Sequence, residues 1–108
     1  MNELKGQATP EQIEKWKKET ADKFGENFKV FSYTVDGSVC YLRSVDRDTY
    51  SAATAKISSS PAKFTQFIID KIWLGGDESI RKDDNKYFGL IDFVEELMNK
   101  KKGELGEL

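Results

Sequence analysis

The sequence predicts a small α+β domain, and three observations carry that prediction. Two alternating runs flank Asp36-Gly37 in the stretch FKVFSYTVDGSVCYLR, residues 28–43, a pattern typical of a β-hairpin with a two-residue turn. Helix-start residues followed by apolar residues at helical spacing occur both before and after this hairpin. With 108 residues, seven Phe, four Tyr and two Trp, the chain has one domain's length and enough bulky side chains for a core.

The N-terminal part of the chain predicts a surface helix. Residues 1–8 have little periodicity, and we expect a flexible tail there. Thr9 can then act as the N-cap, with Pro10 at the first helical position and Gln12 completing a capping box. Gly25 can end this helix in the left-handed conformation. The apolar stripe is narrow and consists of Ile13, Trp16, Thr20 and Phe24.

The hairpin register divides its side chains between two faces. Antiparallel pairing about Asp36-Gly37 places Val35 opposite Ser38 and Tyr33 opposite Cys40. The alternation then predicts a core face made of Phe31, Tyr33, Val35, Cys40 and Leu42. The other face is expected to remain free for water or for another molecule, and carries Val30, Ser32, Thr34, Val39, Tyr41 and Arg43.

Three further helices are expected after the hairpin. Asp46 predicts the N-cap of the first, which buries Tyr50, Ala53, Thr54 and Ile57. Ser60 and Pro61 begin the second, which ends with Trp73-Leu74 before Gly75 and has an apolar face of Phe64, Phe67, Ile68 and Ile72.

The charged segment 77–84 is expected to hold one helical turn before the last helix. That helix is strongly amphipathic, through Tyr87, Leu90, Ile91, Val94, Leu97 and Met98. Lys100, Lys101 and Lys102 lie at its carboxyl end, where the helix dipole favours cations. We expect a single domain over residues 9–102, with all four helices on one hairpin face, and a second flexible tail over 103–108.

Composition and charge disfavour several classes of function. The formal net charge of −2 arises from interspersed acids and bases, so no broad basic field is expected to hold nucleic acid. No segment has the length or hydrophobicity of a membrane span, and the first residues do not resemble a signal peptide. The single cysteine cannot form an internal disulfide, so we expect a reducing, cytoplasmic setting.

The candidate chemical groups have simpler structural interpretations. Cys40 has no histidine anywhere in the chain to activate it, and the register turns it inward, so we expect a buried, unreactive thiol. The acidic segment 77–84 lacks the ligand pattern of a calcium loop, and Gly75-Gly76 lacks the lysine of a phosphate loop. Glu95 and Glu96 point in different directions on a helix. We expect no catalytic residue, no metal and no cofactor.

Protein interaction is the function that the residues favour. Tryptophan, tyrosine and arginine most often anchor interfaces, and a hairpin has two edges to which a partner strand can add. Trp16 and Trp73 lie on apolar faces and are interpreted as core residues. Val39, Tyr41 and Arg43 face away from the expected core and are therefore the predicted contacts with another protein or with a second copy of the chain.

Three blocks of sequence carry a resemblance to a known family. They are Val35-Asp36-Gly37 through Cys40-Tyr41-Leu42-Arg43, then Asp46-Arg47 before an alanine-rich helix, and Trp73-Leu74-Gly75-Gly76-Asp77. Over roughly residues 28–98 the chain resembles the phage tail assembly chaperones, small proteins encoded among phage and prophage tail genes. The resemblance implies a non-enzymatic protein that binds the tape measure protein, and it transfers no individual site residue.

Two other classes of function remain open from the sequence. One is an enzyme or small-ligand protein without histidine chemistry, for which a closed pocket lined by convergent polar groups would be the sign. The other is a regulatory or nucleic-acid accessory domain, which would show a basic face built from Lys15, Lys18, Lys100 and Lys101.

Overall fold

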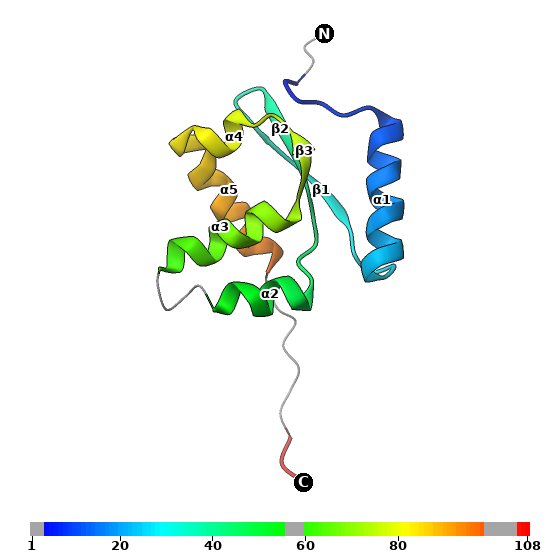
Figure 1. Cartoon of the computed structure of the whole chain (residues 1–108), viewed down its shortest axis with the longest axis vertical. Coiled ribbons are helices and arrows are strands. Elements are labelled where there is room, and N and C mark those ends of the chain that lie inside the picture. The colour runs from blue at the N-terminus through cyan, green and yellow to red at the C-terminus, as the bar shows by residue number, and fades with distance from the viewer. Residues whose placement is uncertain (1–3, 56–59, 99–105) are drawn as a thin grey trace.

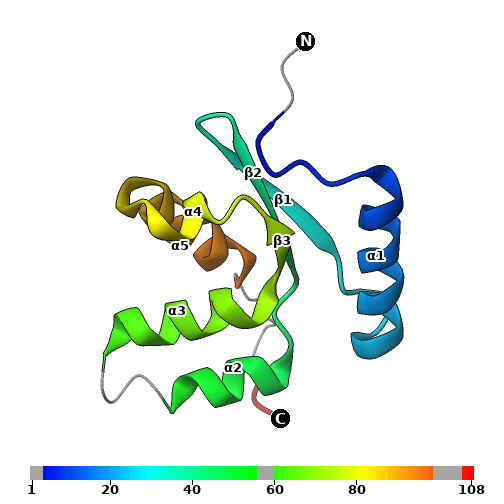
Figure 2. The ribbon, with the colours of Figure 1, turned by 45° about the horizontal axis from the view of Figure 1, so that its top comes forward.

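Helices cover both faces of a small antiparallel sheet (Figures 1 and 2). The computed structural model describes residues 4–55, 60–98 and 106–108. Within these residues the strand order is β1-β2-β3. The helices are α1 (Pro10–Phe24), α2 (Arg47–Thr54), α3 (Pro61–Ile72), α4 (Ser79–Lys82) and α5 (Asp84–Leu97). The strands are β1 (Val30–Val35), β2 (Ser38–Arg43) and β3 (Trp73–Gly76). The α+β class, the N-terminal helix and the hairpin are confirmed.

The hairpin has the predicted register. Val35 pairs with Ser38, Tyr33 with Cys40 and Phe31 with Leu42. Asp36 and Gly37 have φ of 48° and 76°, and two positive values are what a tight turn matched to the strand twist requires. The local turn chemistry therefore fixes which side chains of each strand point to which face.

A third strand, β3, lies where the sequence predicted only the end of a helix. α3 ends at Ile72, and residues 73–76 pair antiparallel with β2, with an irregularity between Tyr41 and Leu42. Gly76 has a φ of 125°, and a Cβ there would lie 2.5 Å from Cys40 Cα. A glycine at this position lets β3 approach β2, so Gly75-Gly76 belongs to a strand rather than to a helix stop.

Most predicted helix ends are confirmed. Thr9 Oγ1 accepts a hydrogen bond from Gln12 N at 3.1 Å, and Asp46 Oδ2 accepts one from Thr49 N at 3.1 Å. Ser60 is the N-cap of α3 without a side-chain hydrogen bond. The single turn expected in the acidic segment is α4. Thr54 is exposed rather than buried, and Ile57 and the three terminal lysines lie outside the described residues.

The main core lies between the sheet and the helices α3, α4 and α5. Its fully buried members are Cys40, Leu42, Ala53, Ile68, Ile69, Ile72, Ile80, Leu90 and Val94. Tyr33 and Val35 pack against this cluster, and Phe31 contacts Phe93 edge-on, so the predicted inner face of the hairpin is confirmed. No helix in the described part of the chain is long and apolar enough to cross a membrane.

Two expectations about the N-terminal region are wrong. α1 does not share a face with the other helices but covers the opposite face of the sheet (Figure 1). Residues 4–8 are not a loose tail, because Lys5 N donates to Gly37 O at 2.8 Å and Lys5 O accepts from Val39 N at 2.9 Å. These residues run along β2 beside the hairpin turn. Residues 1–3 and 103–105 lie outside the described residues.

Candidate functional site

The three residues predicted to contact a partner are buried within the chain itself. The exposed fractions of Val39, Tyr41 and Arg43 are 2%, 6% and 9%. The Tyr41 ring lies 5.3 Å from the Trp16 ring of α1, and its hydroxyl accepts a hydrogen bond from Ala8 N at 3.1 Å. The expectation of a free hairpin face is wrong, because α1 needs a surface on which to bury its own stripe and takes this one.

Arg43, the last residue of β2, connects three helices. Its Nη1 donates to Ser44 O and Asp46 Oδ1, both at 2.9 Å, and its Nη2 donates to Lys71 O at 3.3 Å near the end of α3. The guanidinium carbon lies 4.1 Å from the centre of the Phe24 ring of α1. Arg43 therefore has a structural role, because it connects β2 with α1, α2 and α3.

Asp46 is the second member of this connection. Its carboxylate binds Arg43 and also caps α2 by accepting from Thr49 N. Burial raises the pKa of Asp46, but hydrogen bonds from Thr49 and Arg43 outweigh that effect and leave the pKa below its ordinary value. The carboxylate is thus held ionised between α2 and Arg43.

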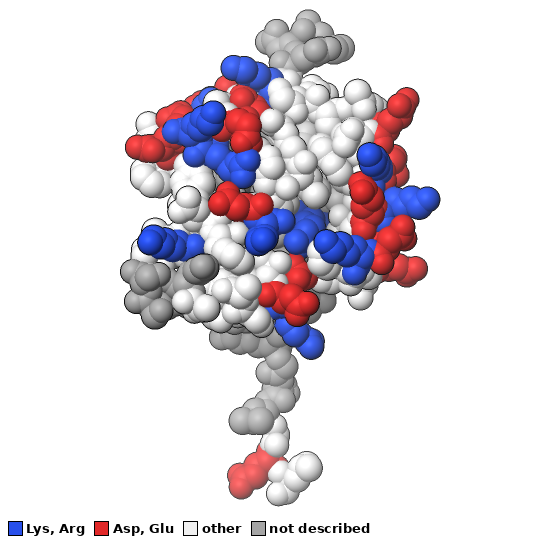
Figure 3. Space-filling view, in the orientation of Figure 1, with Lys and Arg blue, Asp and Glu red and all other residues white. Residues whose placement is uncertain are grey.

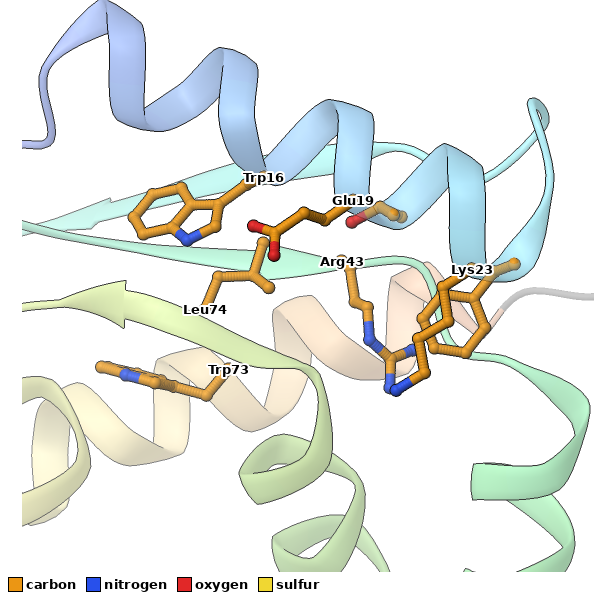
Figure 4. Close-up of a pocket in the computed structure, with 8 residues that line it drawn as sticks. Trp16, Glu19, Lys23, Arg43, Trp73 and Leu74 are labelled. Carbon is orange, nitrogen blue, oxygen red and sulfur yellow. The ribbon is translucent and has the colours of Figure 1, made fainter.

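A groove lies between α1 and β3 on this side of the sheet (Figure 4). It has a volume of about 290 Å³ and is lined by Trp16, Glu19, Thr20, Lys23, Phe24, Arg43, Trp73 and Leu74. Figure 4 shows the Trp16 indole and the Glu19 carboxylate reaching from α1 toward β3, while the Arg43 guanidinium lies beside Lys23. We call this set of eight residues the α1 groove.

A second hollow extends the α1 groove toward α2 and α3. It has a volume of about 450 Å³ and shares Lys23, Phe24 and Arg43 with the first. Its other lining residues are Asp46, Asp48, Thr49, Ala52, Phe67 and Lys71. The two hollows meet at Arg43, so apolar walls near Trp16 continue into a mixed-charge end near α2.

Both tryptophans are held in place at the walls of the α1 groove. A Cβ on Gly75 would lie 2.9 Å from the Trp16 indole, so the glycine lets this ring lie against the strand. Trp73 is covered on one side by Arg81, whose guanidinium carbon lies 4.1 Å from the ring centre. Arg81 is itself paired with Asp70 at 3.1 Å and with Glu78. Both rings are half-buried; Trp16 faces the groove from α1, whereas the Trp73 ring packs against the main core on the other side of β3 and only borders the groove (Figure 4).

The remaining candidate groups have structural roles in the described residues. Cys40 is fully buried, and burial raises the pKa of its thiol to about 12, as expected for an unreactive cysteine. Asp77 accepts hydrogen bonds from Ser38 Oγ and from the amide and hydroxyl of Ser79. No group of three or more His, Cys, Asp or Glu in the described ranges is placed to hold a metal ion.

The sequence did not indicate that Glu19, Lys23 and Leu74 lie in one groove, although a signal was present. The stripe of α1 contains large aromatics, and the outer face of the hairpin contains Val39 and Tyr41. Each of these two apolar surfaces needs another apolar surface against which to pack. Joining the two would have placed α1 across the outer face.

No protein family, curated protein or solved structure matches this chain.

Proposed function

We propose that this chain is a non-enzymatic protein-interaction protein and that the α1 groove is its docking site. The observation that supports this proposal is that Trp16 and Arg43 line one open groove, which Trp73 borders. These are the residue types that most often anchor protein interfaces. Rings fixed by Gly75 and Arg81 lose little conformational freedom when a partner binds, which favours affinity.

The shape and charge of the α1 groove define the kind of segment that it would bind. About 290 Å³ accommodates one or two large apolar side chains beside Trp16 and Leu74. The neighbouring hollow offers Lys23 and Lys71 together with Asp48, so charged residues of both signs next to the apolar anchor would be matched there. The partner is therefore a protein segment with an apolar anchor followed by charged residues.

The resemblance of residues 28–98 to the phage tail assembly chaperones suggests the identity of this partner. We propose that the bound segment belongs to a tape measure protein and that binding takes place in the cytoplasm during tail assembly. The other two classes of function have less support. The α1 groove is open rather than closed, and Lys15 and Lys18 lie on α1 among acidic side chains, within a mixed surface charge (Figure 3).

The two tryptophans provide a direct test, because they are the chain's entire tryptophan content and both line the α1 groove. Overlapping peptides that span a tape measure protein, with any tryptophan replaced by phenylalanine, are titrated into the full chain while tryptophan emission is recorded. We expect neighbouring peptides from one region to shift and quench the emission. If no peptide changes it, the tape measure protein is not the partner.

A pair of charge reversals then locates the binding site. Lys23→Glu changes a side chain that lines both hollows, whereas Lys18→Glu makes the same change on an exposed part of α1 outside them. We expect Lys23→Glu to weaken peptide binding roughly tenfold and Lys18→Glu to leave it nearly unchanged, since rim charges act locally. Equal effects of the two variants would place the binding site elsewhere.

A further inference from the structure

The β1 strand has a free edge in the described part of the chain. Its one strand partner is β2, and the pairs Val35–Ser38, Tyr33–Cys40 and Phe31–Leu42 exchange backbone hydrogen bonds around the two-residue turn. The alternation of an antiparallel ladder therefore turns the amides and carbonyls of Val30, Ser32 and Thr34 away from β2. Ser32 and Thr34 are exposed, so these backbone groups border solvent.

The two edges of the sheet differ in how they are protected. β3 spans Trp73–Gly76, includes two glycines and has an irregular register against β2. β1 runs over Val30–Val35 without a register shift, and its sequence VFSYTV has no proline, glycine or charge. Natural proteins protect free edges with prolines, charges or irregular pairing, and an edge that lacks all of these features readily pairs with another strand. β1 is thus the available edge (Figure 2).

The sequence of β1 is complementary to itself in one antiparallel register. With Ser32 opposite Ser32 of a second copy, Val30 lies opposite Thr34, and the outward backbone groups of all three residues meet. On the inner face the same register places Phe31 opposite Tyr33. These rings already pack on Phe93, at centroid distances of 6.4 and 5.3 Å, and are half-buried, so the second copy would extend an aromatic cluster.

Charge at the ends of β1 favours the same arrangement. A hollow of about 440 Å³ lies at the start of the strand and is lined by Lys17, Ala21, Glu26, Phe28, Lys29 and Val30. In this register the exposed turn residue Asp36 of the second copy comes opposite Phe28, beside Lys29 and near Lys17. The symmetric contact repeats at the other end, so each hairpin turn places a carboxylate at a site where two lysines outnumber one acid, Glu26.

We propose that two copies of this chain pair through their β1 edges, antiparallel and centred on Ser32, to form one continuous six-stranded sheet. The pairing uses the edge of β1, and no β1 residue lines the α1 groove, whose residues come from α1, β2 and β3. The dimer would therefore present two docking sites, which raises avidity for a partner with repeated binding segments.

The first test is the oligomeric state of the full chain and of two lysine variants. Sedimentation of the unchanged protein over a range of concentrations should reveal a reversible dimer. Ser32→Lys places two ammonium groups opposite each other at the centre of the pairing and should raise the dimer dissociation constant roughly tenfold or more at low salt. Ser51→Lys adds the same charge at an exposed site on α2 and should change nothing. A chain that stays monomeric throughout would overturn the proposal.

The second test measures the register itself by crosslinking. In the proposed dimer the two Ser32 Cα atoms lie about 5.5 Å apart, within the range that a disulfide spans, so oxidised Ser32→Cys should give a covalent dimer. Thr34→Cys is the matched control: its two copies are offset by four residues, about 13 Å, and should not crosslink. The native Cys40 is fully buried and should not compete. A dimer in which both variants crosslink equally, or neither does, would reject this register.

The two proposals fail separately. Loss of dimerisation in Ser32→Lys leaves the tryptophan emission assay of the α1 groove available in the monomer. A dimer that forms without any peptide response would support the β1 pairing and exclude the tape measure protein as the partner of the α1 groove.

Discussion

The two faces of the sheet are built from different chemistry, although the same strand supplies both. Toward α3 and α5, the centre of the packing is aliphatic and fully buried, as with Leu42, Ile68 and Leu90, and half-buried rings surround it. Toward α1, the contacts are aromatic, hydrogen-bonded and charged. Thr20 is the one residue of α1 (Pro10–Phe24) that is buried. One face is closed by packing, while the other is held by a few directed contacts and retains grooves.

The comparison shows that the two faces of one hairpin are held by different kinds of interaction. Leu42 and Arg43 are neighbours on β2, yet Leu42 lies in the dry core and Arg43 joins α1, α2 and α3. A rigid core positions the sheet, and the directed contacts on the other side leave Trp16 half-exposed beside the groove. We therefore expect substitutions on the face under α1 to disturb the fold less than substitutions in the dry core.

The largest effect is expected on the dry face. Leu42→Ala removes a fully buried side chain from the centre of the cluster and should lower the free energy of unfolding by about 3–4 kcal/mol, measured by urea denaturation. The matched control is Val30→Ala on β1, which is only half-buried and should cost about 1 kcal/mol. Equal losses for the two variants would remove the distinction between the faces.

A smaller loss is expected on the α1 face, where Arg43 and Asp46 form a nearly buried pair. Arg43→Ala leaves the Asp46 carboxylate without its cation and should cost about 2–3 kcal/mol in the same measurement. Asp46→Ser keeps a cap for α2 while removing the charge. In that background Arg43→Ala should cost at least 1 kcal/mol less, by roughly the strength of a charged hydrogen bond. Additive losses would show that the pair is not coupled.

The hairpin and most helix starts could be predicted from the sequence because their causes are local. Asp36-Gly37 can adopt two positive φ values, and Thr9 and Asp46 cap their helices through hydrogen bonds to residues three positions later. Such features depend on a few neighbouring residues, and the hairpin register then follows from counting outward from the turn. The burial of Cys40 was predictable for the same reason.

The site could not be predicted because its causes are not local. Both faces of the hairpin carry apolar residues, so the sequence leaves open the face on which α1 packs. Gly75 and Gly76 have low strand propensity, yet residues 73–76 form β3 because Gly76 allows close approach to Cys40, far away in the chain. The α1 groove depends on both events and therefore appears only in three dimensions.

A third prediction concerns Gly89, where α5 meets the sheet. A Cβ at this position would lie too close to the Tyr33 hydroxyl, so Gly89→Ala should lower the free energy of unfolding by about 1–2 kcal/mol. Tyr33→Phe removes the obstructing oxygen and should reverse the sign of the change. In that background Gly89→Ala should stabilise the chain by about 0.5–1 kcal/mol, the gain in helix propensity. Denaturation of the four proteins in the cycle measures the coupling, and no rescue by Tyr33→Phe would contradict the close contact.

The smallest effect is a pH dependence of stability that originates at Asp77, which follows β3 and accepts a hydrogen bond from Ser38 of β2. Hydrogen bonds from Ser38 and Ser79 lower the pKa of this carboxyl from 3.8 to about 2. Because the folded pKa lies below the unfolded one, the carboxylate stabilises the fold above pH 3.8, and that contribution is lost as the pH falls from 3.8 toward 2. Asp77→Asn should therefore lower stability near neutral pH and flatten its decline in this acid range, followed by thermal unfolding at each pH. Asp22→Asn, at an exposed position on α1, is the matched control. An equal flattening in both variants would show that the hydrogen bonds of Asp77 do not cause the pH dependence of stability.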